Sequence, residues 1–146
     1  MTHKEKAREL FLQGYNCAQA VFVAFCDVTG MDEETALKLS SSFGAGMGKM
    51  REVCGACSGM FMVAGMLYGY NELDDEAKAE HYAFIQKMAE EFKERNDGTV
   101  ICRDLLKNLA TNITPIPDKR TDEYYKKRPC LKFVEDAADI MDKYIK

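Results

Sequence analysis

Apolar residues recur every three or four positions along most of this chain, which is the spacing of an amphipathic α-helix. No segment sustains the alternation of apolar and polar residues that is typical of a half-buried β-strand. Glycine, proline and capping residues divide the periodic segments. The helices predicted in this way cover residues 4–13, 17–28, 33–42, 53–70, 75–95, 99–109 and 129–145. The pattern predicts an all-α fold, a single compact domain over residues 1–146 with six or seven helices in an orthogonal or bundle-like arrangement.

Local residue types support several of these boundaries. Asn16 and Asp32 are candidate N-caps, because their side-chain oxygens can accept a hydrogen bond from a free backbone N–H of the first turn. Gly14 can end the first helix, and Pro129 is favoured at the first position of the last one. Residues 111–118, which include two prolines, are expected to form a stiff link without a helix.

The glycine-rich segment 44–52 has a superficial likeness to a phosphate-binding loop. Its glycines follow the spacing G-x-G-x-G, whereas the dinucleotide fingerprint needs G-x-G-x-x-G after a β-strand. No strand is predicted before it. We therefore interpret the segment as a flexible link.

Residues 53–71 carry no charge and approach the length of about 20 residues that crosses a bilayer. Four glycines, a serine and two cysteines dilute this stretch, and no second apolar span supports insertion. We interpret it as a buried central helix of a protein without a membrane span.

The composition is that of an ordinary globular chain. Hydrophobic residues make up 47% of the 146 residues, and 24 acidic against 20 basic side chains leave a net charge of -4. Nucleic-acid binding needs a clustered excess of positive charge, so the acidic total argues against it. The small basic and aromatic patch at residues 124–128 is interpreted as a solvated approach to the last helix.

Six cysteines amount to about 4% of the residues, below the roughly 8–10% of a disulfide scaffold. Residues 1–13 contain no continuous apolar run of a secretory signal. We expect a cytoplasmic protein, and in a reducing compartment cysteines more often serve as metal ligands or redox thiols than as structural bridges.

Five cysteines fall at the expected starts of four helices: Cys17, Cys54, Cys57, Cys102 and Cys130. Free backbone N–H groups and the helix dipole favour negative charge there, which makes the thiolate available as a nucleophile or ligand. We therefore predict that these helix starts converge in space, and that at least one of the thiols titrates below the ordinary value of about 8.5. The sixth cysteine, Cys26, lies on the face of its predicted helix opposite to Cys17. We interpret it as a residue that packs in the hydrophobic core.

Cys54 and Cys57 form a C-x-x-C pair on one face of a helix start. Without a βαβ setting this pair does not indicate a thioredoxin fold. Ser58 occupies the position where covalent haem attachment needs histidine. The pair is thus a candidate for thiol chemistry and not for haem.

Gly55 and Gly59 lie four residues apart and leave a groove without side chains beside Cys54. Each glycine inside a helix costs up to about 1 kcal/mol relative to alanine, so the pair needs a reason. We predict that a helix bearing another of the cysteines crosses this groove, and we assign both glycines to the candidate cofactor-binding site.

The runs Gly14–Val21 and Cys54–Gly59, followed by single cysteines, resemble the redox-active protein family named for the pattern C…GCAxxG…C…C. In that pattern the four cysteines match Cys17, Cys54, Cys102 and Cys130, and Cys57 falls on an unspecified position. The glycines of the motif match positions 55 and 59. The resemblance covers nearly the whole chain and implies a small helical redox protein without a defined substrate.

Two functions follow from these observations. In the first, Cys17, Cys54, Cys102 and Cys130 converge for electron transfer, either as ligands of an iron–sulfur cluster or zinc or as thiols that exchange disulfides. Their separations of 37, 48 and 28 residues match neither a ferredoxin nor a zinc ribbon. In the second, the protein is a non-catalytic helical interaction or assembly module whose cysteines only pack.

Other chemistries are disfavoured. A cysteine–histidine hydrolase would need His3, at the terminus, or His81, on an apolar helix face that suits a core histidine better. The sequence does not identify the redox partner protein, and it leaves a homodimer open.

Overall fold

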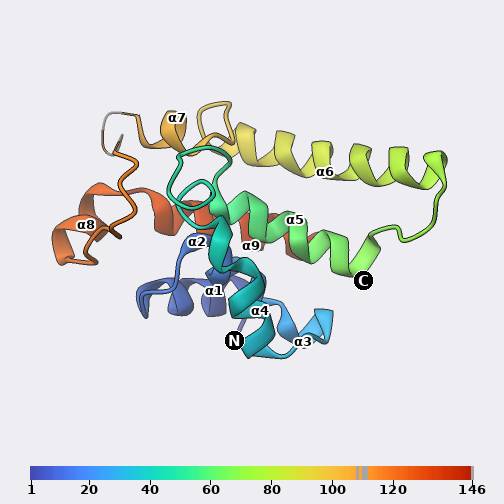
Figure 1. Cartoon of the computed structure of the whole chain (residues 1–146), viewed down its shortest axis with the longest axis horizontal. Coiled ribbons are helices and arrows are strands. Elements are labelled where there is room, and N and C mark those ends of the chain that lie inside the picture. The colour runs from blue at the N-terminus through green and yellow to red at the C-terminus, as the bar shows by residue number, and fades with distance from the viewer. Residues whose placement is uncertain (108, 110–111, 146) are drawn as a thin grey trace.

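The computed structural model describes residues 1–107, 109 and 112–145, and these residues are mainly helical (Figure 1). The α-helices are α1 (His3–Leu12), α2 (Cys17–Ala24), α3 (Cys26–Thr29), α4 (Glu33–Ser40), α5 (Gly55–Tyr68), α6 (Asp75–Arg95), α7 (Cys102–Leu106), α8 (Asp122–Lys127) and α9 (Cys130–Asp142). A short 3-10 helix, η1 (Ser41–Phe43), follows α4. Within the described ranges there is no β-strand, only one antiparallel bridge between Val53 and Ile101. The predicted all-α class is confirmed, with three short helices besides six longer ones.

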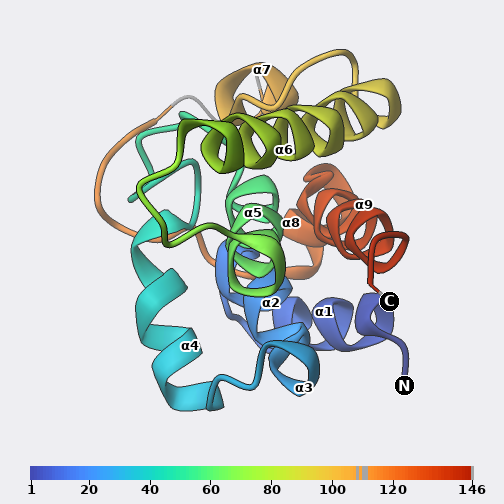
Figure 2. The same ribbon diagram turned by 90° about the vertical axis from the view of Figure 1, so that its right-hand side faces the viewer.

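Helix α5 lies at the centre of the molecule (Figure 2). It packs against α2, α9 and α6, while α1 packs against α2 and α9, and α4 covers α2. The first two-thirds of α5 are almost fully buried, which confirms the interpretation of this uncharged stretch as a central helix. No helix in the described part of the chain has both the length and the apolar character needed to cross a membrane.

The single helix predicted over residues 17–28 is wrong, because the chain breaks at Phe25 into α2 and α3. Phe25 leaves the helical conformation with φ -103° and ψ 14°, and its fully buried ring stacks on His3 of α1. Burial of this aromatic side chain outweighs the continuation of the local helix. Gly30, at φ 77°, then ends α3 in the left-handed conformation.

Residues 44–52 form a tightly turned loop and not the flexible link that was predicted. Four of its six non-glycine residues, Ala45, Met47, Lys49 and Arg51, have positive φ, a conformation that surrounding contacts must stabilise. Backbone hydrogen bonds close the loop, among them one from Arg51 to Ala45 (3.2 Å). The loop turns the side chains of Lys49 and Arg51 inward, and both residues are buried.

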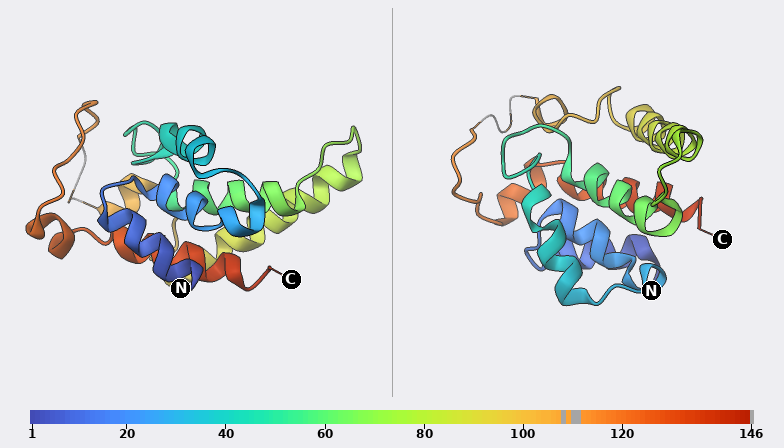
Figure 3. Two further views of the ribbon diagram at one scale, coloured as in Figure 1. Left: turned by 90° about the horizontal axis from the view of Figure 1, so that it is seen from below. Right: turned by 45° about the vertical axis from the view of Figure 1, so that its right-hand side comes forward.

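A helix that the pattern did not predict, α8, precedes α9. Thr121 caps it by accepting a hydrogen bond from the Tyr124 N–H, and acidic residues fill its first turn. Residues 112–121, which we call the strap, lead into α8 without a helix (Figure 3). The predicted stiff link agrees with this over residues 112–118, while its first residue, Thr111, lies outside the described part of the chain.

Candidate functional site

Four cysteines stand at the starts of four different helices. Cys17, Cys102 and Cys130 are the first residues of α2, α7 and α9, and Cys54 is the N-cap of α5. All four line one cavity of about 320 Å³. We call it the cysteine cavity, and it confirms the predicted convergence of these positions in space.

The glycines of α5 bring α2 close enough to place Cys17 there. A Cβ atom on Gly55 would lie 2.3 Å from the Cys17 Sγ atom, and one on Gly59 would lie 2.8 Å from the Ala18 carbonyl oxygen. Contacts this short are not possible for a real side chain, so only glycine permits the crossing. The predicted crossing of α5 by a cysteine-bearing helix is confirmed. Gly55 also lines the cysteine cavity, whereas Gly59 is buried between the two helices.

The other two cysteines occupy different surroundings. Cys57 is fully buried and does not line the cavity, but its thiol affects the pKa of Cys54. Cys26 belongs to α3, does not line the cavity and is partly exposed. Breaking the helix at position 25 therefore does not bring Cys26 into the site.

Burial raises the pKa values of the cavity thiols. It raises the pKa of Cys17 and of Cys102 to about 11, and that of Cys130 to about 12. Nearby cysteines add to each shift, because a second negative charge in the same cavity is unfavourable. For Cys54, the hydrogen bond with Cys57 and then burial hold the pKa well above its ordinary value.

The predicted lowering of a thiol pKa is therefore wrong at these four positions. Backbone N–H groups do act in the predicted direction at Cys17, and Arg51 does so at Cys102. Loss of hydration outweighs both effects. The reduced thiols are consequently protonated at neutral pH.

Cationic side chains line the same cavity: Lys49, Arg51, Arg120 and Arg128. The only carboxylate among the residues that line it is Asp118, on the strap.

Three of the cations converge on this carboxylate. The nearest nitrogen–oxygen distances to Asp118 are 3.1 Å for Arg128, 3.2 Å for Arg51 and 3.7 Å for Lys49. Burial alone would raise the pKa of Asp118, but the three cations outweigh it and the pKa is lowered. Arg51 also donates from Nη1 to the Cys102 sulfur at 3.9 Å, so it joins the carboxylate to a thiol.

Arg120 ties the strap to the first two helices. Its guanidinium donates to the backbone oxygens of Phe11 (2.7 Å) and Tyr15 (2.9 Å), and it lies 4.0 Å from the centroid of the Phe11 ring. These contacts satisfy its donors without neutralising its charge.

Sequence reasoning missed this charged wall. Arg128 and Tyr124 were interpreted as part of a solvated patch, whereas both line the cavity and the Arg128 guanidinium lies 4.9 Å from the Tyr124 ring centroid. The available signal was proximity in sequence, since Arg128 precedes Cys130 by two positions and Arg51 precedes Cys54 by three. No spacing rule, however, connects Asp118 to either arginine.

The four thiols are donors of the kind that bind zinc or an iron–sulfur cluster. Within the residues that the structure describes, however, no three cysteine, histidine or acidic side chains are grouped so that they could hold a metal ion. Thiols can also exchange disulfides without a metal ion.

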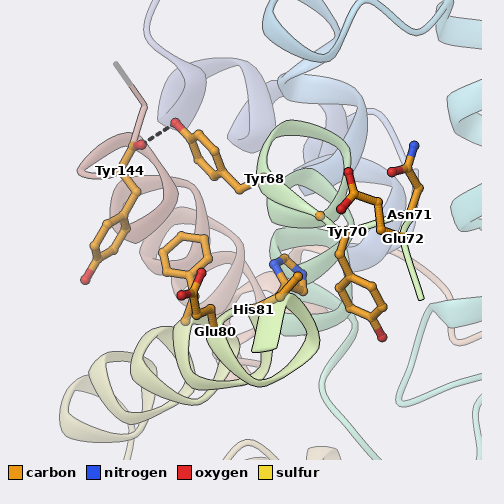
Figure 4. Close-up of a pocket in the computed structure, with 10 residues that line it drawn as sticks. Tyr68, Tyr70, Asn71, Glu72, Glu80, His81 and Tyr144 are labelled. Carbon is orange, nitrogen blue, oxygen red and sulfur yellow. Dashed lines mark hydrogen bonds between the residues drawn. The ribbon is translucent and has the colours of Figure 1, made fainter. Parts of the chain in front are cut away.

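A second cavity of about 490 Å³ lies beside the end of α5 and the first half of α6, and Tyr68, Tyr70, His81 and Tyr144 are among its lining residues (Figure 4). It is larger than the cysteine cavity, but no cysteine is among its lining residues. His81 lies edge-on to Tyr70 and is only partly buried, so it is not the core histidine that was expected.

The other histidine, His3, also lies outside the cysteine cavity. His3 bridges Asp142 (2.6 Å) and Asp27 (2.9 Å). Neither histidine lines the cysteine cavity, which agrees with setting aside a cysteine–histidine hydrolase.

A comparison with protein-family models matches residues 15–144 to the family described as "Putative redox-active protein (C_GCAxxG_C_C)". The matched range contains all four cavity cysteines and both glycines of α5. No curated protein and no solved structure matches the chain. Because the match spans most of its length, this chain belongs to the C_GCAxxG_C_C family.

Proposed function

We propose that this protein is a thiol-based redox carrier in which the cavity cysteines pass between thiol and disulfide states. The observation that carries the proposal is the convergence of Cys17, Cys54, Cys102 and Cys130 on one cavity. Cys54 lies close enough to the other three cysteines for its charge to affect their ionisation. Cysteines that serve only as core residues would have no reason to lie at the starts of four helices around one cavity.

The entry point is a partly exposed cysteine beside the start of α5. Cys17 keeps partial exposure, whereas Cys54 is buried, and the Cys17 sulfur lies against Gly55, the residue next to Cys54. We assign Cys17 as the attacking thiol and Cys54 as the resolving thiol. Cys57, hydrogen bonded to Cys54, is a second partner for it.

The reaction uses an external disulfide as oxidant. The Cys17 thiolate attacks one sulfur of the disulfide, and the first thiol leaves with a proton from the medium. The Cys54 thiolate then attacks the Cys17 sulfur of this mixed disulfide, and the second thiol leaves in the same way. Two protein thiols have lost two electrons and two protons to form one disulfide, and the external disulfide has gained both.

Trapping the mixed disulfide tests this assignment. The Cys54→Ser variant should hold the external thiol on Cys17, detectable as an added mass on the Cys17 peptide, while the wild-type protein should form an internal disulfide. Cys26→Ser, which changes a cysteine outside the cavity, is the matched control and should behave as the wild type.

Two results would overturn the proposal. Stoichiometric iron or zinc in anaerobically prepared protein would make the cysteines a ligand set. Metal-free protein whose cavity thiols do not react with a disulfide while it is folded would leave the non-catalytic interaction or assembly protein as the correct description.

A further inference from the structure

The charge of the cysteine cavity is opposite to that of the whole chain. The chain carries a net charge of -4, yet four cations and one carboxylate line this cavity. The thiols add no charge while they are protonated. The cavity wall therefore has an excess of three positive charges.

These cations are not solvated surface groups. The exposed fractions of their side chains are 4% for Arg51, 9% for Lys49 and 13% for Arg128. Removing a cation from water is costly unless a negative partner replaces the lost hydration. Asp118 provides one negative charge for all three, and it is itself 31% exposed. The buried wall is thus short of negative charge.

The thiols do not fill this shortage in the reduced protein. Burial keeps the pKa of Cys102 at about 11 even though the Arg51 guanidinium contacts its sulfur. The excess positive charge along the cavity wall can therefore attract an anion that enters the cavity.

We propose that the cysteine cavity accepts an anionic substrate, a small disulfide that carries a carboxylate or phosphate group bound by Arg51, Arg128 and Lys49. A cavity of about 320 Å³ suits a small molecule. Arginine binds carboxylate and phosphate through charge-assisted pairs of hydrogen bonds. Naming the ligand a substrate rests on the redox function proposed above, whereas binding of the anion does not.

Arg51 explains how anion binding and thiol chemistry share one cavity. One of its terminal nitrogens contacts Cys102 and the other donates to Asp118 at 3.2 Å. An oxyanion that joins Asp118 on this guanidinium would lie next to Cys102, in the cavity that Cys17 and Cys54 also line. The wall therefore positions the substrate and also favours anionic disulfides over neutral ones.

A series of disulfides that differ in charge tests the inference. The probes are 3,3'-dithiodipropionate (anionic), bis(2-hydroxyethyl) disulfide (neutral) and cystamine (cationic). Each rate of oxidation of the reduced protein is divided by the rate of the same probe with N-acetylcysteine, which removes intrinsic reactivity. We expect the order anionic, neutral, cationic, with about tenfold between the first two, as charge-assisted hydrogen bonds imply.

Variants locate the effect. Arg128→Gln and Lys49→Gln should each lower the ratio of the normalised dithiodipropionate rate to the normalised neutral rate about tenfold. Arg103→Gln is the matched control, because Arg103 is half-exposed, pairs with Glu52 and does not line the cavity. If one variant unfolds, its rate of oxidation by the neutral disulfide will rise. The result with the other variant then tests the inference.

The outcomes separate the two proposals. Equal normalised rates for all three probes would overturn the anionic substrate and leave the redox function intact. No reaction with any probe would overturn the redox function. In that case calorimetry with succinate, which cannot be reduced by thiols, tests the anion site directly, and binding that is absent in wild type or unchanged in Arg128→Gln would overturn this inference too.

Discussion

Two opposing influences act on each cavity cysteine. A helix start stabilises the thiolate through free backbone N–H groups, whereas burial removes the water that would hydrate it. At Cys17 the second influence is larger, and its pKa is raised to about 11. The position of a cysteine at a helix start therefore indicates only that the helix lowers its pKa. Burial by the surrounding protein decides whether the pKa is lowered or raised overall.

Alkylation against pH measures this balance directly. With iodoacetamide and peptide mass spectrometry on the native reduced protein, labelling of Cys17 and Cys102 should accelerate tenfold per pH unit up to about pH 11. A rate that levels off below pH 8.5 at either position would contradict the raised pKa values.

Asp118 is the one carboxylate among four cavity cations, and its removal should destabilise the protein. We expect Asp118→Asn to lower the free energy of unfolding at pH 7 by about 1–3 kcal/mol, less than for a fully buried pair because 31% of the side chain is exposed.

The pH dependence of this effect has a definite sign. The pKa of Asp118 is lowered in the folded protein. The stability that Asp118 contributes is therefore present above its ordinary pKa of about 3.9, and it is lost as the pH falls through the lowered pKa of the folded state. Urea unfolding of wild type and Asp118→Asn should converge at low pH. Glu123→Gln, in an exposed pair with Lys127, serves as the control and should change stability by less than about 0.5 kcal/mol.

At the scale of elements, the crossing of α2 over α5 depends on glycine at two positions only. A Cβ on Gly59 would meet backbone at 2.8 Å, whereas a Cβ on Gly65, two turns nearer the end of α5, would meet nothing within 4 Å. Substitution by alanine should therefore have opposite effects on the free energy of unfolding at the two positions.

We expect Gly59→Ala to lower the free energy of unfolding by about 1–3 kcal/mol through overpacking. Gly65→Ala should raise it by about 0.4–1 kcal/mol, because alanine restricts the unfolded chain and favours the helix. Denaturant midpoints check both. A stabilising Gly59→Ala would show that the two helices do not need the close approach.

Element boundaries followed from the sequence where they depend on neighbours in the chain. The caps at Asn16 and Asp32 and the range 75–95 of α6 agree with the structure. The break at Phe25 was missed, because it arises from packing of that ring against α1. Residues 122–127 had a capping threonine, acidic residues and then lysines, but no apolar stripe, so helix α8 was overlooked.

At the scale of the whole molecule, protonated thiols link the redox cavity to stability at high pH. Raised thiol pKa values mean that the folded state holds these protons more tightly than the unfolded chain. Stability from this source is complete below the ordinary thiol pKa of about 8.5 and is lost as the pH rises toward about 11–12.

The Cys130→Ser variant isolates this effect, since serine does not titrate in that range. Its free energy of unfolding should fall less than that of the wild type between pH 8 and 10, by roughly 1.4 kcal/mol per pH unit at most. Urea unfolding at several pH values under reducing conditions measures the difference. Parallel curves for the two proteins would refute a raised pKa at Cys130.

The sequence by itself determined the helical class, the central place of the helix predicted over residues 53–70 and the set of four cysteines at helix starts. Periodicity, caps and the cysteine pattern are properties of neighbouring residues, and they need no knowledge of the rest of the chain. The glycine pair also implied a crossing helix, because glycine inside a helix calls for close packing.

Only the tertiary structure decided the chemistry of the cavity. Whether a thiol is protonated depends on how much protein surrounds it, and burial reversed the shift that the helix starts alone predicted. The convergence of Lys49, Arg51 and Arg128 on Asp118 joins a loop, a strap and the residue that follows α8. Contacts between segments so far apart leave no spacing signal in the sequence, because charge pairing depends on distance in space and not along the chain.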